Sequence, residues 1–523
     1  MKKNYIAFFS IFIFALNTSA QVYSDVAGIF YNRCAPCHHQ GGGAPFALTS
    51  YSQTSPWCLT IQTVLNSGAM PPWPPDTTYS RFLHERVITL AEKNAIISWI
   101  GGGCQQGDTT LAPPAPVFPQ YQLYGTPSLT LTIPVFTSNA STDDAYNCFS
   151  LPTGLLQDRW LRAYEVVPGN PSIVHHVIVN VDTVGSTSND LSGNCFNTPG
   201  HFSIGGYAPG AAPTVFPAIA PMKSGIRIKA GSKIVMQIHY PAGSAGQQDS
   251  TKIRIYFYPI GETGIRPVFV DTPLQNWLLY IPANTVQTFS ASYSVSVALS
   301  IYAAFPHSHK VCTSIINYAN NGTDTIPLIR INNWNFEWQG FYTYRSPVKI
   351  PAGYTMRSRH VYDNTTANPN NPNTPPQLVV AGTSTTDEML FDAFMYLLYQ
   401  PGDENIDIQA LLQGDTLMFP TAVHEKPTAK SDIVVYPNPA TNQLTVRSSE
   451  FGDKKIELVE IYNVVGKKVY SQISLPAEVS FSTQAGNLKS QISIDISQLK
   501  AGIYFIKVLA GSESVFKKIV VER

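Results

Sequence analysis

The chain has 523 residues, which is too many for one hydrophobic core, so several domains are expected. Lysine plus arginine and aspartate plus glutamate each number 34, so the net charge is +0 at pH 7. This balance excludes the basic bias typical of proteins that bind nucleic acid or an anionic membrane surface. After residue 120, short runs of valine, isoleucine, threonine and tyrosine are broken by glycine, proline and asparagine, which predicts a mainly β protein of sandwiches or jelly rolls.

Residues 1–20 have the features of a secretory signal peptide. Lys2 and Lys3 form a basic end, an apolar run covers 5–16, and small residues lead to a cleavage position after Ala20. The alternative is a transmembrane anchor, but the run is short for a bilayer, and no later segment offers about 18 uninterrupted apolar residues. We therefore expect an exported protein with no stable membrane span.

A small helical region is expected over residues 21–107. Apolar periodicity predicts helices over 24–39, 59–68 and 89–103, and the last of these ends in glycines. The segment LAPPAPVFPQ indicates a proline-rich linker, which we place at 108–124.

The segment CAPCH, from Cys34 to His38, has the C-x-x-C-H pattern of covalent c-type haem attachment. Cys34 and Cys37 would bond to the haem vinyl groups, and His38 would lie under the iron. Met70 precedes a rigid proline-rich loop and is the candidate sixth ligand, because Met/His ligation favours electron transfer. The alternatives are a Cys34–Cys37 disulfide, a zinc site and a Met70 that only packs in the core. His39 lacks the spacing needed to replace His38.

With this motif, residues 21–107 resemble small class I-like cytochrome c domains. The resemblance implies one covalently attached haem c. The seven cysteines of an exported chain indicate disulfides or cofactor attachment. Cys58 and Cys104 have no part in the haem motif and could pair across this domain.

Histidines recur in apolar strand-like runs of the β region. His175 and His176 are adjacent in SIVHHVIVNV, His239 lies in IVMQIHYPAG, and His307 and His309 form H-x-H in YAAFPHSHKV. Residues i and i+2 of a strand share one face, so the H-x-H pair can reach one metal ion. Adjacent strand residues face opposite ways, so the HH pair requires a strand bend or coordination through different ring nitrogens. Taken singly, each histidine is instead read as a hydrogen-bonded core residue.

Met389 follows two acidic residues in TSTTDEMLFDAF. Imidazole suits copper, and a thioether selects the Cu(I) state. Together with the histidines, Met389 therefore suggests two redox copper centres. Zinc is the main rival for a group of three histidines, but zinc sites rarely include methionine.

In order and spacing, the motifs HH, QIHY, HSH and DEM resemble those of the copper type II ascorbate-dependent monooxygenases. The resemblance implies two tandem jelly-roll β-sandwich domains, at 125–272 and 273–420, each with one copper ion. The implied ligands of the electron-supplying copper are His175, His176 and His239. The implied ligands of the oxygen-binding, catalytic copper are His307, His309 and Met389.

The resemblance implies hydroxylation of an activated C–H bond. O2 would bind the reduced catalytic copper, a copper–oxygen species would abstract hydrogen, and the other copper would supply the second electron. An external donor must provide electrons, usually ascorbate in this family, and the fused haem could take its place. Cys148 matches a cysteine of the family and could pair with Cys195. Cys312 is left as a buried thiol or, as the alternative, an extra soft ligand.

The sequence departs from the peptide-specific members of this family. Those members have an arginine two residues before H-x-H and polar residues after the ligand methionine, which hold the substrate carboxylate. Here these positions are Phe305, Phe391 and Ala393, so that clamp is absent. We therefore expect an apolar or aromatic substrate instead of a glycine-extended peptide. Asp392 is either a polar contact for the substrate or, as we expect, a surface acid.

A second linker is expected over 421–432. The segments YPNPATNQL and LKAGIYFIKV in 433–523 resemble the C-terminal sorting domain of the type IX secretion system. This implies an immunoglobulin-like β-sandwich, the secretion machinery as a partner, and passage through the periplasm to the cell surface or medium. A permanent carbohydrate-binding or adhesive sandwich is the alternative.

The resulting hypothesis is an exported copper-dependent monooxygenase with two copper ions and one haem c. Its fold would be two tandem jelly-roll β-sandwich domains, preceded by a small α-helical cytochrome c-like domain and followed by the immunoglobulin-like sandwich. Two other hypotheses remain open. One is a non-catalytic surface protein that transfers electrons or binds copper, and the other is a hydrolase with histidine-bound zinc.

Overall fold

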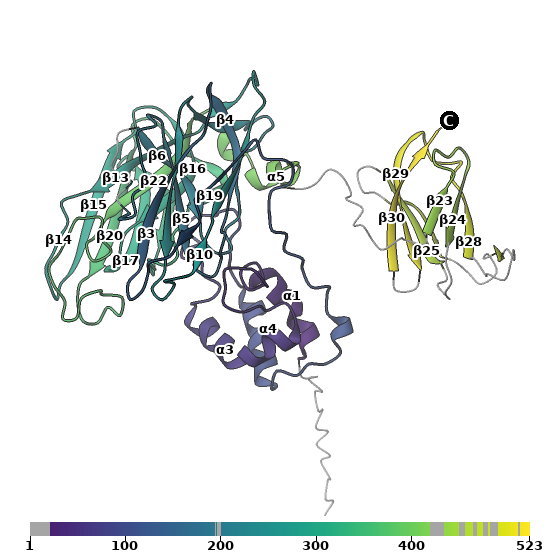
Figure 1. Ribbon diagram of the computed structural model, residues 1–523, viewed down its shortest axis with the longest axis horizontal. Coiled ribbons are helices and arrows are strands. Elements are labelled where there is room, and N and C mark those ends of the chain that lie inside the picture. Colours follow the sequence, from purple (N-terminus) through teal and green to yellow (C-terminus); the bar gives the residue numbers. More distant parts are fainter. Residues whose placement is uncertain are drawn as a thin grey trace, which may run out of the picture. The chain divides into compact units, whose positions relative to one another are not determined.

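A computed structural model describes the chain over residues 21–193, 195, 200–418, 433–448, 456–463, 468–473, 480–481, 490–510 and 513–522. The expected signal peptide at 1–20 and the expected linker at 421–432 lie outside the described residues. The chain divides into two compact units, residues 1–419 and residues 420–523. As predicted, the described part is mainly β, with a small helical region near its N-terminal end (Figure 1).

The helical region folds around a small aromatic core. Its elements are α1 (Tyr23–Arg33), α2 (Tyr51–Thr54), η1 (Ser55–Trp57), α3 (Cys58–Ser67), α4 (Leu90–Gly101) and η2 (Thr109–Leu111). Tyr23 and Phe30 of α1 pack ring against ring on Trp99 of α4, with centroids 5.9 and 5.7 Å from the Trp99 ring. A disulfide joins Cys58 to Cys104 beside this core, a pairing that the sequence left as a possibility.

Local sequence sets where these helices begin and end. Thr89 and Glu92 form a capping box at the start of α4, and Gly68 ends α3 in the left-handed conformation at φ 74°. Helix α1 stops at Arg33, so the C-x-x-C-H motif at 34–38 follows the helix. Our expectation of a helix through the motif was wrong.

The first β-sandwich follows. Its strands are β1 (Leu129–Thr132), β2 (Phe136–Thr137), β3 (Ala145–Pro152), β4 (Arg159–Val167), β5 (His176–Asp182), β6 (His201–Tyr207), β7 (Thr214–Val215), β8 (Ser224–Ile228), β9 (Lys233–Tyr240), β10 (Gln248–Asp249), β11 (Lys252–Phe257) and β12 (Arg266–Pro267). One sheet has the order β1-β11-β4-β8-β12, with β7 on β4, and the other has the order β3-β9-β5-β6. Val177, Val179 and Val181 alternate into the core from β5. The expected disulfide between Cys148 and Cys195 is present.

The second β-sandwich has two four-stranded sheets. Its elements are β13 (Phe269–Asn276), β14 (Tyr280–Ile281), β15 (Val286–Ser294), β16 (Leu299–His307), β17 (Cys312–Asn320), β18 (Thr325–Ile331), β19 (Tyr342–Ile350), β20 (Thr355–Asp363), β21 (Val379–Val380), β22 (Leu390–Leu398), η3 (Asp403–Asn405) and α5 (Ile408–Gln413). The sheets have the orders β13-β22-β16-β19 and β15-β20-β17-β18. Cys312 is buried between them, as we expected, and its thiol donates to the carbonyl of Ser314.

Residues 71–87, here called the docking segment, tie the helical region to the second sandwich. Phe82 is only 1% exposed and forms a bridge to Tyr344, with ring centroids 4.9 Å apart. The carboxylate of Asp76 accepts from the Arg330 guanidinium at 2.7 Å. The helical region is thus anchored to the β-sandwiches by pairing, packing and charge.

The second compact unit is a smaller β-sandwich, as predicted. Its strands are β23 (Ile433–Tyr436), β24 (Gln443–Ser448), β25 (Ile456–Asn463), β26 (Lys468–Ile473), β27 (Ser480–Phe481), β28 (Ser490–Asp495), β29 (Gly502–Ala510) and β30 (Glu513–Val521). They form two sheets, β23-β24-β28-β27 and β26-β25-β29-β30. Leu444, Ile461 and Ile506 are fully buried between these sheets.

Candidate metal centres

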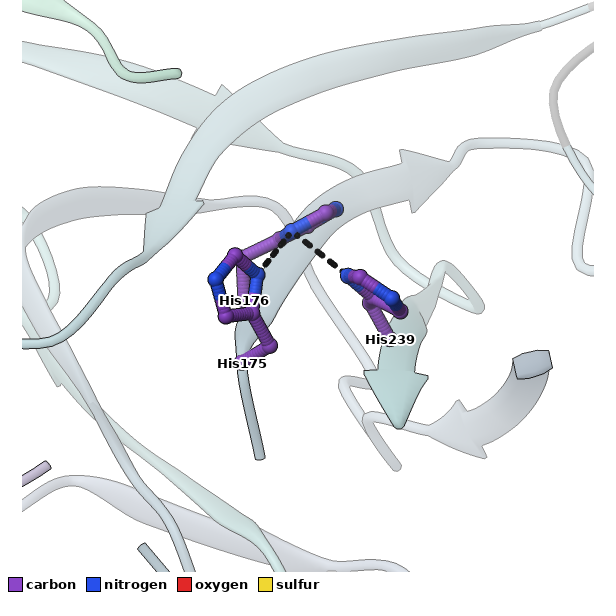
Figure 2. Close-up of side chains that lie close together, drawn as sticks. All are labelled: His175, His176 and His239. Carbon is purple, nitrogen blue, oxygen red and sulfur yellow. Dashed lines mark hydrogen bonds between the residues drawn. The ribbon is translucent and has the colours of Figure 1, made fainter. Parts of the chain in front are cut away.

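Three histidines of the first sandwich lie together and point toward one another (Figure 2). His176 begins β5 and is the register partner of His239 on β9. The backbone N–H of His175 donates to the carbonyl of His239 at 3.0 Å. The Nδ1 atom of His176 lies 3.3 Å from that of His175 and 3.2 Å from that of His239.

The start of β5 explains how two adjacent histidines reach one point. The strand that we predicted over 172–181 begins only at His176, because a turn in which the N–H of Ile173 donates to Asn170 precedes it. His175 therefore lies outside the regular strand, where side-chain alternation does not apply. Of our two expectations, the departure from a regular strand is the one that the structure shows, and the Nδ1 atoms of the three rings are the atoms that approach one another.

This arrangement of nitrogens suits a cation better than a proton. The ligand atoms of the three rings lie within 4.8 Å of one another. The Nδ1 atom of His176 carries either one proton or one lone pair, so it can satisfy only one of its two neighbours. A metal ion between the rings would satisfy all three lone pairs, and three imidazoles fit copper or zinc.

The surroundings hold these three rings in fixed orientations. Burial, followed by the neighbouring His239 and His175, holds the pKa of His176 well below its usual range. On the outer side, the Asp144 carboxylate lies 3.3 Å from Nε2 of His239, and Glu337 lies 3.4 Å from Nε2 of His175. Carboxylates at the outer ring nitrogens are the usual means of turning the other nitrogen toward a metal.

The second histidine pair lies at the end of β16. Nδ1 of His307 is 2.5 Å from Oε1 of Gln339, and Nδ1 of His309 is 3.0 Å from the carbonyl of Asp387. These bonds leave Nε2 of both rings available, and the ring centroids are 5.2 Å apart. Our expectation of an H-x-H pair on one strand was wrong in part, because β16 ends at His307 and His309 lies beyond it.

Met389 is held against this turn through its backbone. Its carbonyl accepts from the Ser308 hydroxyl at 2.7 Å and from the Tyr362 hydroxyl at 2.9 Å. The strand register pairs His307 with Phe391, two residues after Met389. The structure thus brings the backbone of the predicted thioether ligand to the H-x-H turn.

A buried carboxylate that we did not single out anchors the turn. Glu388 is 0% exposed. Its carboxylate accepts from the backbone N–H groups of His309 (2.8 Å), Val311 (2.7 Å), Cys312 (3.1 Å) and Met389 (3.1 Å), and from the Ser308 hydroxyl (2.8 Å). Burial raises the pKa of Glu388 to about 6, and these hydrogen bonds act in the opposite direction. The signal in the sequence was an acid directly before the apolar run of β22.

Our expectation that Asp392 is a surface acid was wrong. Asp392 is 0% exposed, accepts from the Ser358 hydroxyl at 2.5 Å and lies 3.1 Å from Nε2 of His360. The backbone N–H of His307 also points at it, at 3.4 Å. Asp392 is therefore an internal support beneath the end of β16.

The burial of the H-x-H pair predicts how stability depends on pH. Burial lowers the pKa of His307 to about 3 and that of His309 to about 4, below the value of about 6.5 for an unfolded histidine. The unfolded state binds more protons in this window, so the metal-free protein should lose stability as the pH falls from about 6.5 to 3. Urea denaturation between pH 7 and 4 measures this loss. The double variant His307→Asn, His309→Asn should lose less on acidification, and an equal loss would contradict the prediction.

The haem motif has its thiols unpaired and its histidine oriented. Cys34 and Cys37 are both free. Nδ1 of His38 lies 3.1 Å from the carbonyl of Phe46, which leaves Nε2 available as a ligand. Met70 lies directly before the docking segment. The donor set required for a covalent haem is thus compatible with the local structure.

The motif also packs against the first sandwich. The Cys37 thiol lies 3.6 Å from the carbonyl of Pro209, to which it donates, and a Cβ on Gly210 would overlap the Cys37 sulfur. These residues follow Tyr207, which ends β6 and is the register partner of Val177 on β5. Val177 directly follows His176. The loop that contacts Cys37 therefore begins at the residue paired with the neighbour of His176.

This close approach gives a prediction for Gly210→Ala. Gly210 and Gly231 both have φ of 75°, but nothing lies near a Cβ on Gly231. Alanine at either position should cost about 1 kcal/mol for backbone strain. Overlap with Cys37 should add about 1–3 kcal/mol at Gly210 only. Urea denaturation of the two variants measures the difference, and equal losses would rule out the tight packing.

A cavity of about 150 Å³ lies where the docking segment meets both sandwiches. His176 of the first histidine group lines it, as does Gln339, which holds His307 of the second. Trp73 and Arg86 contribute a wall from the docking segment. The cavity therefore borders residues of both candidate centres.

Residues 280–410 match the family model of the copper type II ascorbate-dependent monooxygenase, C-terminal domain. This match contains His307, His309 and Met389, and it supports a copper monooxygenase-like, oxidoreductase role. Residues 434–522 match the model of the secretion system C-terminal sorting domain, which indicates export to the cell surface or secretion. Among the described helices, none is long and apolar enough to cross a membrane.

No curated protein matches the chain. Among solved structures, it is similar to the VP2 subviral particle of infectious bursal disease virus at 8% identity, over 55% of this chain and 75% of that chain, with a TM-score of 0.16. It is similar to the BSP domain of a biofilm-associated protein at 9% identity, over 78% of this chain and 84% of that chain, with a TM-score of 0.14. Likenesses at such TM-scores carry no argument about fold or function.

Proposed function

We propose that this protein is an exported copper-dependent monooxygenase that hydroxylates a C–H bond with O2 and takes electrons from its fused c-type haem. The observation that carries the proposal is the convergence of three histidine Nδ1 atoms on one point. This point lies in the compact unit that also contains the matched monooxygenase domain.

The proposal assigns a set of ligand residues to each of the two copper ions and to the haem. The first copper would be bound by His175, His176 and His239, and the second by His307, His309 and Met389. The haem would be bound by Cys34, Cys37, His38 and Met70. When bound, these groups would supply one-electron redox chemistry and the activation of O2.

One loop of the second sandwich contacts both histidine groups. The loop at 332–341, here called the bridging loop, connects β18 to β19. Its Glu337 lies 3.4 Å from His175, and its Gln339 lies 2.5 Å from His307. The two centres would therefore share a common support, which fixes their orientation to each other.

The packing of the haem motif supports electron supply from the haem. Cys37 contacts Pro209 in the loop after β6, and Tyr207 at the end of β6 pairs with Val177 beside His176. The haem motif thus packs against the loop that follows the strand end paired beside His176. This proximity, which does not depend on the thiol proton, supports electron supply from the haem. The docking segment holds the helical region in this position.

Metal analysis and labelled O2 test the proposal. The purified exported chain should contain about two copper ions and one haem iron, and it should transfer one atom of labelled O2 to a small aromatic substrate when a one-electron reductant is present. A His38→Ala variant that still binds copper should be reduced more slowly by a donor that reacts with the haem. Zinc in place of copper would refute the proposal. Copper without any oxygen transfer would favour the non-catalytic electron-transfer or copper-binding protein.

A further inference from the structure

The cavity between the docking segment and the sandwiches has an aromatic side close to the H-x-H pair. Phe305 and Phe341 both line it and are stacked, with ring centroids 4.7 Å apart. Phe305 is also stacked on His307 at 6.0 Å. With a volume of about 150 Å³, the cavity matches the size that accepts a single benzene ring.

The docking segment adds one positive charge to this wall. The Nε–H of Arg86 donates to the carbonyl of Pro72 at 3.2 Å, which leaves both terminal nitrogens of the guanidinium for other partners. The guanidinium carbon is 5.7 Å from the Trp73 ring centroid. Within the described residues, no carboxylate forms an ion pair with Arg86.

An uncompensated guanidinium beside a cavity is costly, because the charge is partly desolvated without an anion. Burial raises the pKa of the Cys37 thiol, and the positive charge of Arg86 acts in the opposite direction. A second polar group in the same wall lacks a partner, since Nε1 of Trp73 is buried and forms no hydrogen bond. A carboxylate in the cavity would satisfy the guanidinium bidentately.

We propose that this cavity binds the substrate and that the substrate is a small aromatic carboxylic acid. Its ring lies against Phe305 and Phe341, and its carboxylate is bound by Arg86 of the docking segment. The inference rests on the proposed function and names its substrate class. The clamp comes from the helical region instead of the position before H-x-H, where the chain has Phe305.

Calorimetry on the full exported chain tests the inference with benzoate and its neutral isostere benzamide. Benzoate should bind more tightly than benzamide. Arg86→Gln should weaken benzoate at least about tenfold and leave benzamide unchanged, and Arg86→Lys should keep most of the affinity. Arg227→Gln is the matched control, since Arg227 is 61% exposed and paired with Asp158. Equal binding of both compounds, or no effect of Arg86→Gln, would overturn the inference.

A haem propionate is the other carboxylate that Arg86 could bind, because Arg86 lies near Cys37. The titration is therefore repeated on chain prepared without haem. Benzoate binding in both preparations supports the substrate site, and binding only without haem assigns Arg86 to the propionate and overturns it. Metal content is measured in the same samples. If copper is present but benzoate binding does not depend on Arg86, this inference alone is overturned. If copper is absent, the proposed function is overturned.

Discussion

The His239→Ala variant is expected to lose about one of its two copper ions and all substrate-dependent oxygen transfer. His239 supplies one of three converging Nδ1 atoms and is the register partner of His176. Two imidazoles cannot complete the donor set, so the affinity for copper at this site should fall by more than about 100-fold. The removal also leaves the Asp144 carboxylate without its imidazole, which otherwise lowers the pKa of Asp144.

Copper per chain, measured by elemental analysis after dialysis against a chelator, checks this expectation. His201→Ala is the matched control, because His201 lies in the same sheet and also faces a carboxylate, that of Asp182, at 3.6 Å. The control should keep both copper ions. Full copper content in His239→Ala, or equal loss in the two variants, would show that the three rings are not a metal site.

The second large effect is expected on stability, from Glu388→Ala. The substitution leaves three buried backbone N–H groups, the part-buried N–H of Met389 and the Ser308 hydroxyl without their acceptor. Each unsatisfied buried donor costs about 1–3 kcal/mol, and partial relaxation should bring the total to about 3–5 kcal/mol. Because these donors include the backbone N–H groups of His309 and Met389, copper at the second site should be lost as well.

Urea denaturation of the metal-free chain separates the two consequences. Glu388→Gln keeps one acceptor oxygen and should fall between wild type and alanine. Glu337→Ala serves as the control in the same sandwich, since its side chain is 46% exposed and its loss should change the free energy of unfolding by less than about 0.5 kcal/mol. Comparable losses in Glu388→Ala and Glu337→Ala would contradict the role of Glu388 as the anchor of the turn.

The sequence was sufficient to predict what depends on local pattern. Strand alternation, turn residues and helix caps gave the mainly β fold, the helical region and the β-sandwich tail. Adjacent His175 and His176 predicted either a departure from strand geometry or coordination through different ring nitrogens, and the structure has a departure at the start of β5. The family resemblance implied that Cys148 could pair with Cys195, and pairing of Cys58 with Cys104 was left as a possibility; both disulfides are present.

The sequence could not predict what depends on contacts between distant segments. Glu388 and Asp392 look like ordinary acids in a strand-like run, and only the packing of β16, β20 and β22 buries them. The bridging loop and the docking segment show no helical or strand periodicity of apolar residues. Their contacts with other sheets could therefore not be predicted from the sequence. The wall of the cavity that holds Arg86 was missed for the same reason.

The docking segment also has a consequence for the order of assembly. Asp76 is separated by 254 residues from Arg330, and Cys37 by 172 residues from Pro209. During synthesis the Cys37 thiol therefore emerges long before Pro209, which it contacts in the folded chain. Attachment of a haem vinyl group to Cys37 before residue 209 is synthesised would leave this contact undisturbed, whereas attachment in the folded chain would have to break the hydrogen bond to Pro209.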